Sequence, residues 1–267
     1  MRILCLNAWG GRLHAPLLSF LAEADPDVLC LQEVTRGRDG SPGWLTYRDG
    51  DHELRQRADL LGDLRKALPR HDAYFCPAAR GLLYDGERPV PSEHGLATFV
   101  RNTLSVIGQA QDFVHGTFSA RGWGDHPRAR NAHCVRVFSG ELGGTVTVAH
   151  MHGLRDPAGK GDTPARASQA QSFAGLIRRV WSPGERLVAC GDFNVLPDSQ
   201  TFDTLGTLGL VDLVTGRGHA DTRTSHYRKA ERFADYMLVT RQVEVLRFDV
   251  PAEPEVSDHR PLVAEIA

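Results

Sequence analysis

The sequence of 267 residues has no excess of either charge and few cysteines. Its 31 lysines and arginines are balanced by 33 acidic residues, so it lacks the basic excess that is typical of non-specific nucleic-acid binders. The five cysteines are scattered, odd in number and mostly inside apolar runs. No two have C-x-x-C spacing, which argues against a structural zinc site of that type and favours reduced core thiols.

Long hydrophobic runs are also missing. No apolar run reaches the length that spans a membrane, and Met1 leads directly into a strand-like segment rather than a signal peptide. A hydrophobic content of 41% and a charged content of 24% are ordinary for a soluble globular protein. Without repeats, low-complexity tracts or a dividing linker, we expect one cytoplasmic domain over residues 1–267, and we predict no protein partner.

One run stands out within the sequence, Leu187–Val195, which reads Leu-Val-Ala-Cys-Gly-Asp-Phe-Asn-Val. Four apolar residues before Gly191 predict a strand that is buried on both faces. A carboxylate is costly to bury without a partner, so Asp192 at the end of this strand indicates a site. A period of two places Asn194 on the same side. The alternative is an ordinary strand-to-turn transition, where Asp and Asn are common.

The first part of the chain predicts a strand, a helix and a second strand. Residues 2–6 and 28–31 are short apolar runs, and residues 17–21 carry an apolar stripe at helical spacing. The two strands end at polar residues, Asn7 and Glu33. This order favours a layered α/β protein.

The next part predicts a loop and a helix, followed by a series of strands. Residues 35–51 are rich in Gly, Arg and Asp, and the leucines of residues 53–68 recur at helical spacing up to Pro69. Short strands with brief connections follow, at residues 73–76, 95–100, 104–107, 134–138 and 145–149. This spacing favours antiparallel or mixed pairing, and no G-x-G-x-x-G follows the first strand, so a pure nucleotide-binding sheet is not expected.

Residues 116–130 combine glycines, arginines and aromatics and predict a surface loop. It is either a substrate-binding loop, because arginine matches phosphate oxygens and aromatics stack on bases, or a solvated loop. Beyond it, Thr163 followed by Pro164 predicts a helix start, and residues 201–208 predict a short helix. The remaining apolar runs predict strands at residues 233–239, 243–250 and 262–266.

Polar side chains recur where the predicted strands end. They are Asn7, Glu33, His150 and His152, Asp192 and Asn194, Asp235, and Asp258 and His259. Each alone is unremarkable as a turn residue, but carboxylates, amides and imidazoles without cysteine suit a hard cation such as magnesium or manganese. Histidine can supply a proton or hold a phosphoryl oxygen. The set fits metal-assisted attack of water on a phosphate ester.

The same residues carry a resemblance to a known family. In this order, Asn7, Leu31-Gln32-Glu33, His152, Gly191-Asp192-Phe193-Asn194, Asp235-Tyr236 and Ser257-Asp258-His259 resemble the endonuclease/exonuclease/phosphatase (deoxyribonuclease I-like) superfamily over residues 2–266. The resemblance implies an α/β four-layer sandwich of two facing mixed β-sheets flanked by helices, with the site at one edge. It implies a Mg²⁺- or Mn²⁺-dependent phosphodiesterase whose substrate is a phosphate ester, with nucleic acid as one candidate.

The resemblance also implies residue roles. Glu33 would bind the metal, with Asn7 and Asp258 in or near its shell. Asp192 would orient or deprotonate the attacking water, and Asn194 would fix Asp192 and the phosphate. The other catalytic residues it implies are His259 for the charge on the phosphoryl group, Asp235 for the orientation of His259, and His152 for the phosphate or leaving group. His150 would stand behind them.

Several readings stay open beside a phosphodiesterase or nuclease. One is a phosphomonoesterase or a lipid or inositol phosphate headgroup hydrolase on the same scaffold, and another is a non-catalytic binding module. A zinc hydrolase built on His150 and His152 would need further ligands. Trp9 stands where many repair-type members carry Asp, and Glu231–Ala234 replaces the Gly-Trp-Arg run of abasic-site endonucleases, so an abasic-repair role is not expected.

Overall fold

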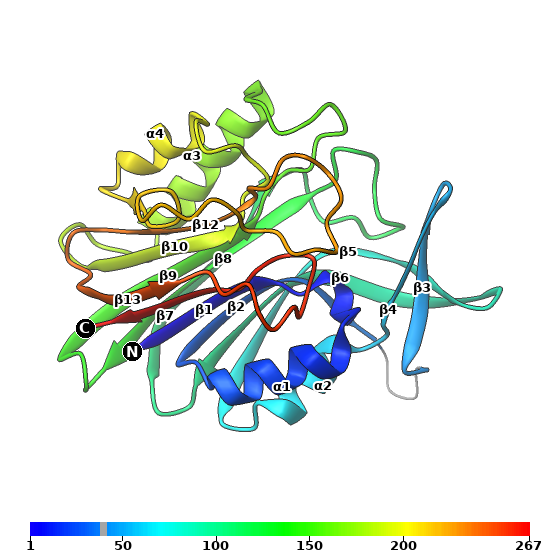
Figure 1. The fold of residues 1–267 in the computed structure, drawn as a ribbon, viewed down its shortest axis with the longest axis horizontal. Helices are drawn as coiled ribbons and strands as arrows, with labels where there is room; N and C mark the ends of the chain where they lie inside the picture. The colour runs from blue at the N-terminus through cyan, green and yellow to red at the C-terminus, as the bar shows by residue number, and fades with distance from the viewer. Residues whose placement is uncertain (38–41) are drawn as a thin grey trace.

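The computed structural model describes residues 1–37 and 42–267, which form two β-sheets flanked by helices (Figure 1). The strands of the first sheet are β1 (Arg2–Asn7), β2 (Val28–Arg36), β3 (Trp44–Asp49), β4 (His52–Arg57), β5 (His71–Asp85), β6 (Arg88–Arg101), β13 (Val245–Asp249) and β14 (Leu262–Ile266). The strands of the second are β7 (Ser105–His115), β8 (Arg130–Ser139), β9 (Gly144–His152), β10 (Arg186–Asp192), β11 (Val211–Asp212) and β12 (Asp235–Val239). The helices are α1 (His14–Ala24), α2 (Leu60–Ala67), α3 (Pro164–Arg178), α4 (Thr201–Gly206) and the short 3₁₀ helix η1 (Trp9–Gly11).

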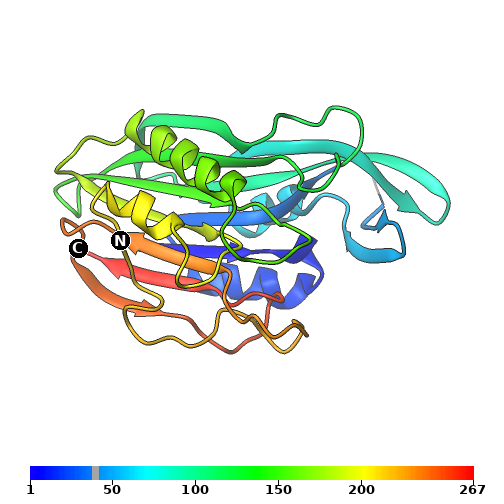
Figure 2. The ribbon, with the colours of Figure 1, turned by 90° about the horizontal axis from the view of Figure 1, so that it is seen from above.

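Both sheets are mixed. Their strand orders are β13-β14-β1-β2-β6-β5-β3-β4 and β11-β12-β10-β9-β8-β7. The pairs β1–β2 and β9–β10 are parallel, and their outer neighbours are antiparallel. Helices α1 and α2 cover the first sheet from outside, and α3 and α4 cover the second (Figures 1 and 2). The predicted α/β four-layer sandwich is therefore confirmed.

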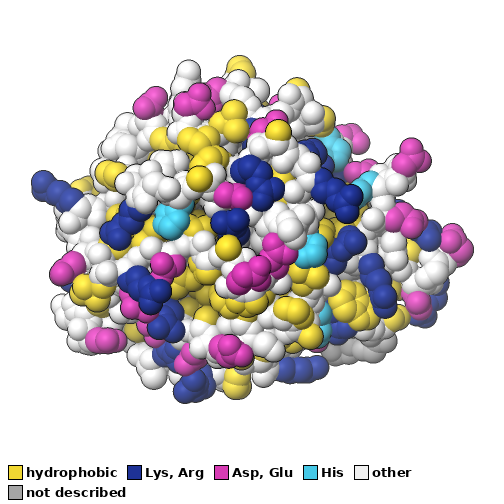
Figure 3. Space-filling model, in the orientation of Figure 1, with side chains coloured by type: hydrophobic (Ala, Val, Ile, Leu, Met, Phe, Trp, Pro, Cys, Tyr) yellow, Lys and Arg dark blue, Asp and Glu magenta, His cyan; other side chains and the backbone are white. Residues whose placement is uncertain are grey.

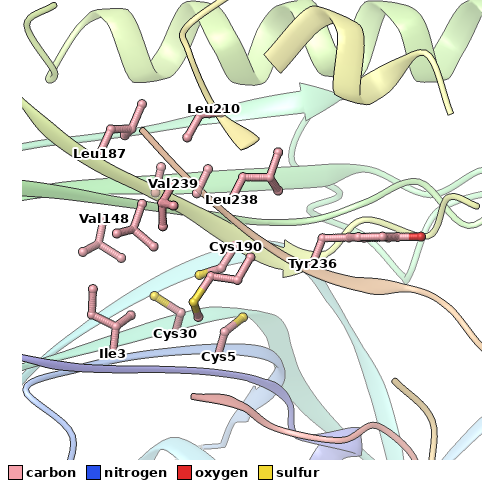
Figure 4. Close-up of a cluster of buried hydrophobic side chains, with 14 of the residues drawn as sticks. Ile3, Cys5, Cys30, Val148, Leu187, Cys190, Leu210, Tyr236, Leu238 and Val239 are labelled. Atoms are coloured by element: carbon pink, nitrogen blue, oxygen red, sulfur yellow. The ribbon is translucent and has the colours of Figure 1, made fainter. Parts of the chain in front are cut away.

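Strand β1 shows why the sheets stack in this way. Successive side chains of a strand point to opposite faces. Ile3 and Cys5 belong to the apolar cluster between the sheets, whereas Leu4 and Leu6 belong to the cluster under α1 and α2. Figure 4 shows Ile3 and Cys5 near Cys30 of β2 and Cys190 of β10. The five cysteines, all within the described part of the chain, are free and buried, as the reduced-thiol prediction requires.

Two predictions in the first third of the chain are wrong. Residues 35–51 are not a loop, because β2 continues to Arg36 and residues 44–49 form β3; residues 38–41 lie outside the described part. Residues 53–68 are not one helix, because residues 52–57 form β4 and α2 begins only at Leu60. Strand β4 pairs with β3 across a two-residue turn, where Gly50 supplies the positive φ of 56° that such hairpins need. Hairpin pairing outweighs the helical spacing of the leucines.

The later strands lie where the sequence places them but several are longer. Strands β5 and β6 extend over residues 71–101 as one long hairpin that projects beyond the sheet in Figure 1. Residues 116–129 carry no strand or helix, although Ser119 forms a bridge to β5. The predicted helix start is confirmed, because the Thr163 hydroxyl accepts a hydrogen bond from the Arg166 amide. No helix in the described ranges has the length and apolar character needed to cross a membrane.

Candidate active site

The strand ends meet at one rim of the sandwich because of the sheet registers. In the parallel pair β1–β2, Asn7 lies opposite Gln32, next to Glu33. In the second sheet, Asp192 at the end of β10 lies opposite both His152 of β9 and Asp235 of β12. Neighbouring strands therefore deliver polar side chains from both sheets to the same edge. Asn7, His152 and Asp192 are the last residues of their strands, whereas Asp235 is the first residue of β12, which is antiparallel to β10.

A bulge directs Glu33 toward the second sheet. The pairing of β2 with β6 shifts register between Leu31 and Val34, and Glu33 adopts a positive φ of 55°. Bulges of this kind bend a strand and re-aim a side chain. Asn7 Nδ2 donates to Glu33 Oε1 at 3.2 Å and to Asp192 Oδ2 at 3.0 Å. One amide therefore links a carboxylate of each sheet.

The position of Asp192 depends on Gly191, the residue before it. Gly191 has a φ of 142°, and a Cβ at this position would lie 2.1 Å from the carbonyl oxygen of Met151. Asp192 Oδ1 then accepts the backbone N–H of Asn194 at 3.1 Å. Strand β10 ends at Asp192 and Asn194 has a left-handed φ of 54°, so the predicted period of two does not reach Asn194. Its side-chain amide donates to the carbonyl oxygen of Gly153 instead, at 3.3 Å.

His259 and Asp235 form a closely coupled buried pair. His259 Nδ1 lies 2.8 Å from both carboxylate oxygens of Asp235, and both side chains are 4% exposed. Burial raises the pKa of Asp235 to about 7, with nearby Arg223 opposing the rise. Burial, and then the charge of Arg223, lowers the pKa of His259. The pair fixes the imidazole so that Nε2 faces Asp192 Oδ2 at 3.7 Å.

Two further side chains close the cluster. His152 Nε2 lies 3.7 Å from Asp192 Oδ2 and 3.9 Å from Glu33 Oε1. Asp258 Oδ1 lies 3.8 Å from His259 Nε2. The Ser257 hydroxyl donates to the carbonyl oxygen of Asn7 at 2.6 Å, which fastens this C-terminal segment to the end of β1. All eight predicted site residues therefore lie together, although Asn194 turns its side chain toward Gly153.

Cationic residues that the sequence analysis did not single out also reach this cluster. Arg223, between β11 and β12, contacts His259 Nε2 through Nη1, and Nη1 lies 3.4 Å from Asp258 Oδ2. Lys160 donates to the carbonyl oxygen of Phe233. Neither residue follows an apolar strand, so no periodicity could have found them.

His150 lies behind the cluster in a hydrogen-bonded chain between the sheets. Gln32 Nε2 lies 3.2 Å from His150 Nδ1, and Thr98 Oγ1 lies 2.8 Å from His150 Nε2 and 2.7 Å from His133 Nδ1. Because an amide nitrogen only donates, His150 Nδ1 accepts and Nε2–H donates to Thr98, whose hydroxyl donates to His133. Both nitrogens of His150 are thus engaged, which argues against a zinc site on His150 and His152.

The hydrogen bonds of His150 and His133 require both imidazole rings to be neutral. Burial lowers the pKa of His133 to about 4 and that of His150 well below 6.5. When folding depresses the pKa of a histidine, the free energy of unfolding decreases as the pH falls from the unfolded pKa to the folded pKa. For His133 this range runs from 6.5 down to about 4.

We expect the His133→Asn variant to be less stable than the wild type at pH 7, because it loses ring packing against Tyr74. Below pH 6.5 the wild type loses stability because it must keep His133 neutral, whereas the variant has no imidazole at this position. The difference in unfolding free energy between the two proteins should therefore narrow by up to about 1.4 kcal/mol per pH unit. Urea unfolding of both proteins between pH 7 and pH 5 measures it. A gap that stays constant would show that His133 is not held neutral.

Comparisons with known proteins agree with this architecture. The sequence profile described as "Endonuclease/Exonuclease/phosphatase family" matches residues 4–259. The chain belongs to this family, whose members are hydrolases, and its two mixed sheets have the deoxyribonuclease I-like fold. No curated protein sequence matches the chain.

Solved structures of the family are similar in fold but distant in sequence. An endonuclease/exonuclease/phosphatase of Bacteroides vulgatus is 19% identical, with a TM-score of 0.70 and coverage of 100% of this chain and 98% of that chain. A mannosyl-6-phosphatase of Bacteroides thetaiotaomicron is 17% identical, with a TM-score of 0.69 and coverage of 100% and 99%. The human nocturnin catalytic domain with bound sulfate is 18% identical, with a TM-score of 0.65 and coverage of 100% and 93%. At these identities the likeness shows the fold alone.

Proposed function

We propose that the protein is a Mg²⁺- or Mn²⁺-dependent phosphoesterase that hydrolyses a phosphodiester by attack of water. The observation that carries the proposal is the contact of Asn7 with Glu33 and Asp192 at the rim, beside the Asp235–His259 pair. We also propose that residues 1–267 form one domain and that the protein is cytoplasmic.

The residues around Glu33 fit a hard cation. Among the described residues, the carboxylate of Glu33 receives a side-chain hydrogen bond only from Asn7, and its side chain is 27% exposed. Burial would raise the pKa of Glu33, but the neighbouring His94 and His259, the Asn7 hydrogen bond and Arg130 together lower it, so the carboxylate stays ionised. Glu33 and Asp258 therefore offer carboxylate oxygens of the kind that Mg²⁺ and Mn²⁺ prefer. Asn7 would join them by turning its amide, whose oxygen accepts the Trp9 N–H at 3.0 Å while its nitrogen donates to Glu33. A cation held there would supply Lewis-acid polarisation of the phosphoryl group and a template for the substrate.

A second grouping could also hold an ion, since ligand atoms of Asp192, Asp235 and His259 all lie within 4.8 Å of one another. Both oxygens of Asp235 already contact His259 Nδ1, and Asp192 accepts two amide hydrogen bonds. We assign this trio to proton handling instead of metal binding.

The chain's own residues then take distinct roles. Asp192 accepts the proton of the attacking water as the new P–O bond forms and the ester P–O bond breaks, and the amides of Asn7 and Asn194 hold its oxygens in place. His152 and His259 each present Nε2 3.7 Å from Asp192 Oδ2, so both flank the volume that a phosphoryl group would occupy. Asp235 fixes the orientation of His259.

The surface favours a small or lipid-derived phosphate ester over long duplex DNA. Acidic and basic side chains are interspersed on the face shown in Figure 3, and the net charge is -2. Duplex binding depends on neutralising many phosphates with basic residues.

A phosphomonoester is the second candidate. A monoester carries more negative charge at neutral pH than a diester, and Arg223 and Lys160 add two cations beside the acidic cluster. A solved structure of the same fold is a mannosyl-6-phosphatase.

The test is hydrolysis of bis-p-nitrophenyl phosphate and p-nitrophenyl phosphate by purified protein. We expect turnover with Mg²⁺ or Mn²⁺, and we expect EDTA to abolish it and added metal to restore it. The ratio of kcat/KM for the two substrates separates a diesterase from a monoesterase. Turnover that survives exhaustive chelation, or the absence of turnover with every metal and both substrates, would contradict the proposal.

A further inference from the structure

We infer that Arg223 is a further catalytic residue, which binds a non-bridging oxygen of the phosphoryl group beside His259. This inference deepens the proposed function and rests on it for the identity of the anion.

The guanidinium of Arg223 is buried but poorly satisfied. Its side chain is 5% exposed and stacks over the ring of Tyr227, with Cζ 4.2 Å from the ring centroid. Nη1 contacts His259 Nε2 and lies 3.4 Å from Asp258 Oδ2. Within residues 1–37 and 42–267, Nε is buried without a hydrogen-bond partner and Nη2 donates no hydrogen bond.

A buried cation of this kind calls for an anionic acceptor. Leaving a buried charged donor unpaired is costly, whereas a guanidinium pairs well with two oxygens of one phosphate. Asp258 supplies only one long contact, and the nearest acceptor is the nitrogen of a neutral imidazole. Two oxygens of a phosphoryl group in front of His259 would supply anionic acceptors for Nη1 and for Nη2, which donates no hydrogen bond in the described chain.

The contact with His259 has a direct consequence for the proton on that ring. His259 Nδ1–H points at Asp235, so Nε2 carries the lone pair that accepts a hydrogen bond from Arg223. The imidazole is therefore neutral. A phosphoryl oxygen that takes over the hydrogen bond from Arg223 Nη1 leaves Nε2 without that donor and facing the same phosphoryl group. Arg223 stays protonated throughout and forms no covalent bond.

The backbone of Arg223 is held in place by its neighbours. Its N–H donates to Asp221 Oδ1 at 2.6 Å, and its carbonyl oxygen accepts from Arg232 Nη2 and Arg260 Nε, each at 2.9 Å. Residue 223 also forms a β-bridge with His259. These contacts position Arg223 before any ligand arrives, which is what preorganised stabilisation of charge requires.

The alternative is that Arg223 acts only as a counter-ion for the surrounding carboxylates. Arg223→Ala and Arg223→Lys, with the exposed Arg179→Ala as a matched control, separate the two roles. We expect Arg223→Ala to lower kcat with either p-nitrophenyl substrate about 100-fold, as loss of one charge-stabilising donor does. Arg223→Lys should recover part of the loss, and Arg179→Ala should match the wild type.

Chemical rescue is the decisive part of the test. Millimolar guanidinium should raise kcat of Arg223→Ala in a saturable way and leave Arg223→Lys and the wild type unchanged. Loss of activity without rescue, at an unchanged melting temperature, would overturn the inference, as would a variant with wild-type kcat.

Binding of inorganic phosphate to the metal-free protein, followed by ³¹P NMR, judges Arg223 without turnover. We expect binding by the wild type and by Arg179→Ala and much weaker binding by Arg223→Ala. Equal binding by all three would overturn the inference. A wild type that binds phosphate through Arg223 but hydrolyses neither ester would contradict the proposed function and leave the anion site standing.

Discussion

The Asp192→Asn variant should lose at least about 1,000-fold in kcat on bis-p-nitrophenyl phosphate, within the range that general acid–base groups contribute. Asparagine keeps the shape of the side chain but cannot take a proton from water. Asp192 is 3% exposed as a side chain and lies between His152 and His259, with Nε2 of each ring 3.7 Å away. No other carboxylate in the described part of the chain lies between the two rings.

The same substitution should leave the protein folded. Burial raises the pKa of Asp192, with the neighbouring His259 opposing the rise, so its ionised form destabilises the fold above the unfolded pKa of 3.8. Asparagine removes that cost and gives up one of the two hydrogen bonds from Asn7 and Asn194, worth about 1 kcal/mol. We expect a melting temperature within about 4 °C of the wild type. Wild-type turnover in the variant would show that Asp192 is not the base.

The Glu33→Gln variant should require far more metal than the wild type. It removes the one rim carboxylate whose side-chain contacts in the described chain are limited to Asn7 and a distant His152. Loss of a direct ligand should raise the Mg²⁺ or Mn²⁺ concentration for half-maximal activity by at least the roughly 10- to 100-fold that outer-shell partners contribute. Titration of activity against metal at saturating substrate measures this.

A matched control for Glu33→Gln is Asp112→Asn, which removes an exposed carboxylate that pairs with Arg179. It should titrate with metal as the wild type does. Saturating metal should restore part of the kcat of Glu33→Gln, because Asn7 and Asp258 remain. An unchanged titration curve for Glu33→Gln would mean that the ion is held elsewhere, with the Asp192–Asp235–His259 trio as the next candidate.

The strand-end residues of the site could be found from sequence because of simple geometry. Short apolar runs predict buried strands, and a polar residue directly after such a run lies at the edge of the sheet. Asn7 and Asp192 obey this rule, and Asp235 stands directly before the apolar run of β12, which is antiparallel to β10 and so begins at the same edge. The fold class followed from the family resemblance, which the two mixed sheets confirm.

Other parts depend on pairing that no local pattern encodes. Residues 52–57 form β4 because β3 pairs with them, although Leu54 is in helical spacing with the leucines that follow it up to Leu68. Glu33 reaches the rim through a bulge opposite β6, which the sequence of β2 does not reveal. Arg223 is brought to His259 by a bridge between two irregular segments far apart in the chain.

The central claim is that Glu33, with Asn7 and Asp258, holds one divalent ion beside Asp192 and the Asp235–His259 pair. A crystal of the protein soaked with Mn²⁺, measured at a wavelength where manganese scatters anomalously, tests it most directly. We predict an anomalous peak within coordination distance of a Glu33 carboxylate oxygen. A peak held by Asp192, Asp235 and His259 instead, or no peak at this rim in a crystal of active protein, would contradict the claim.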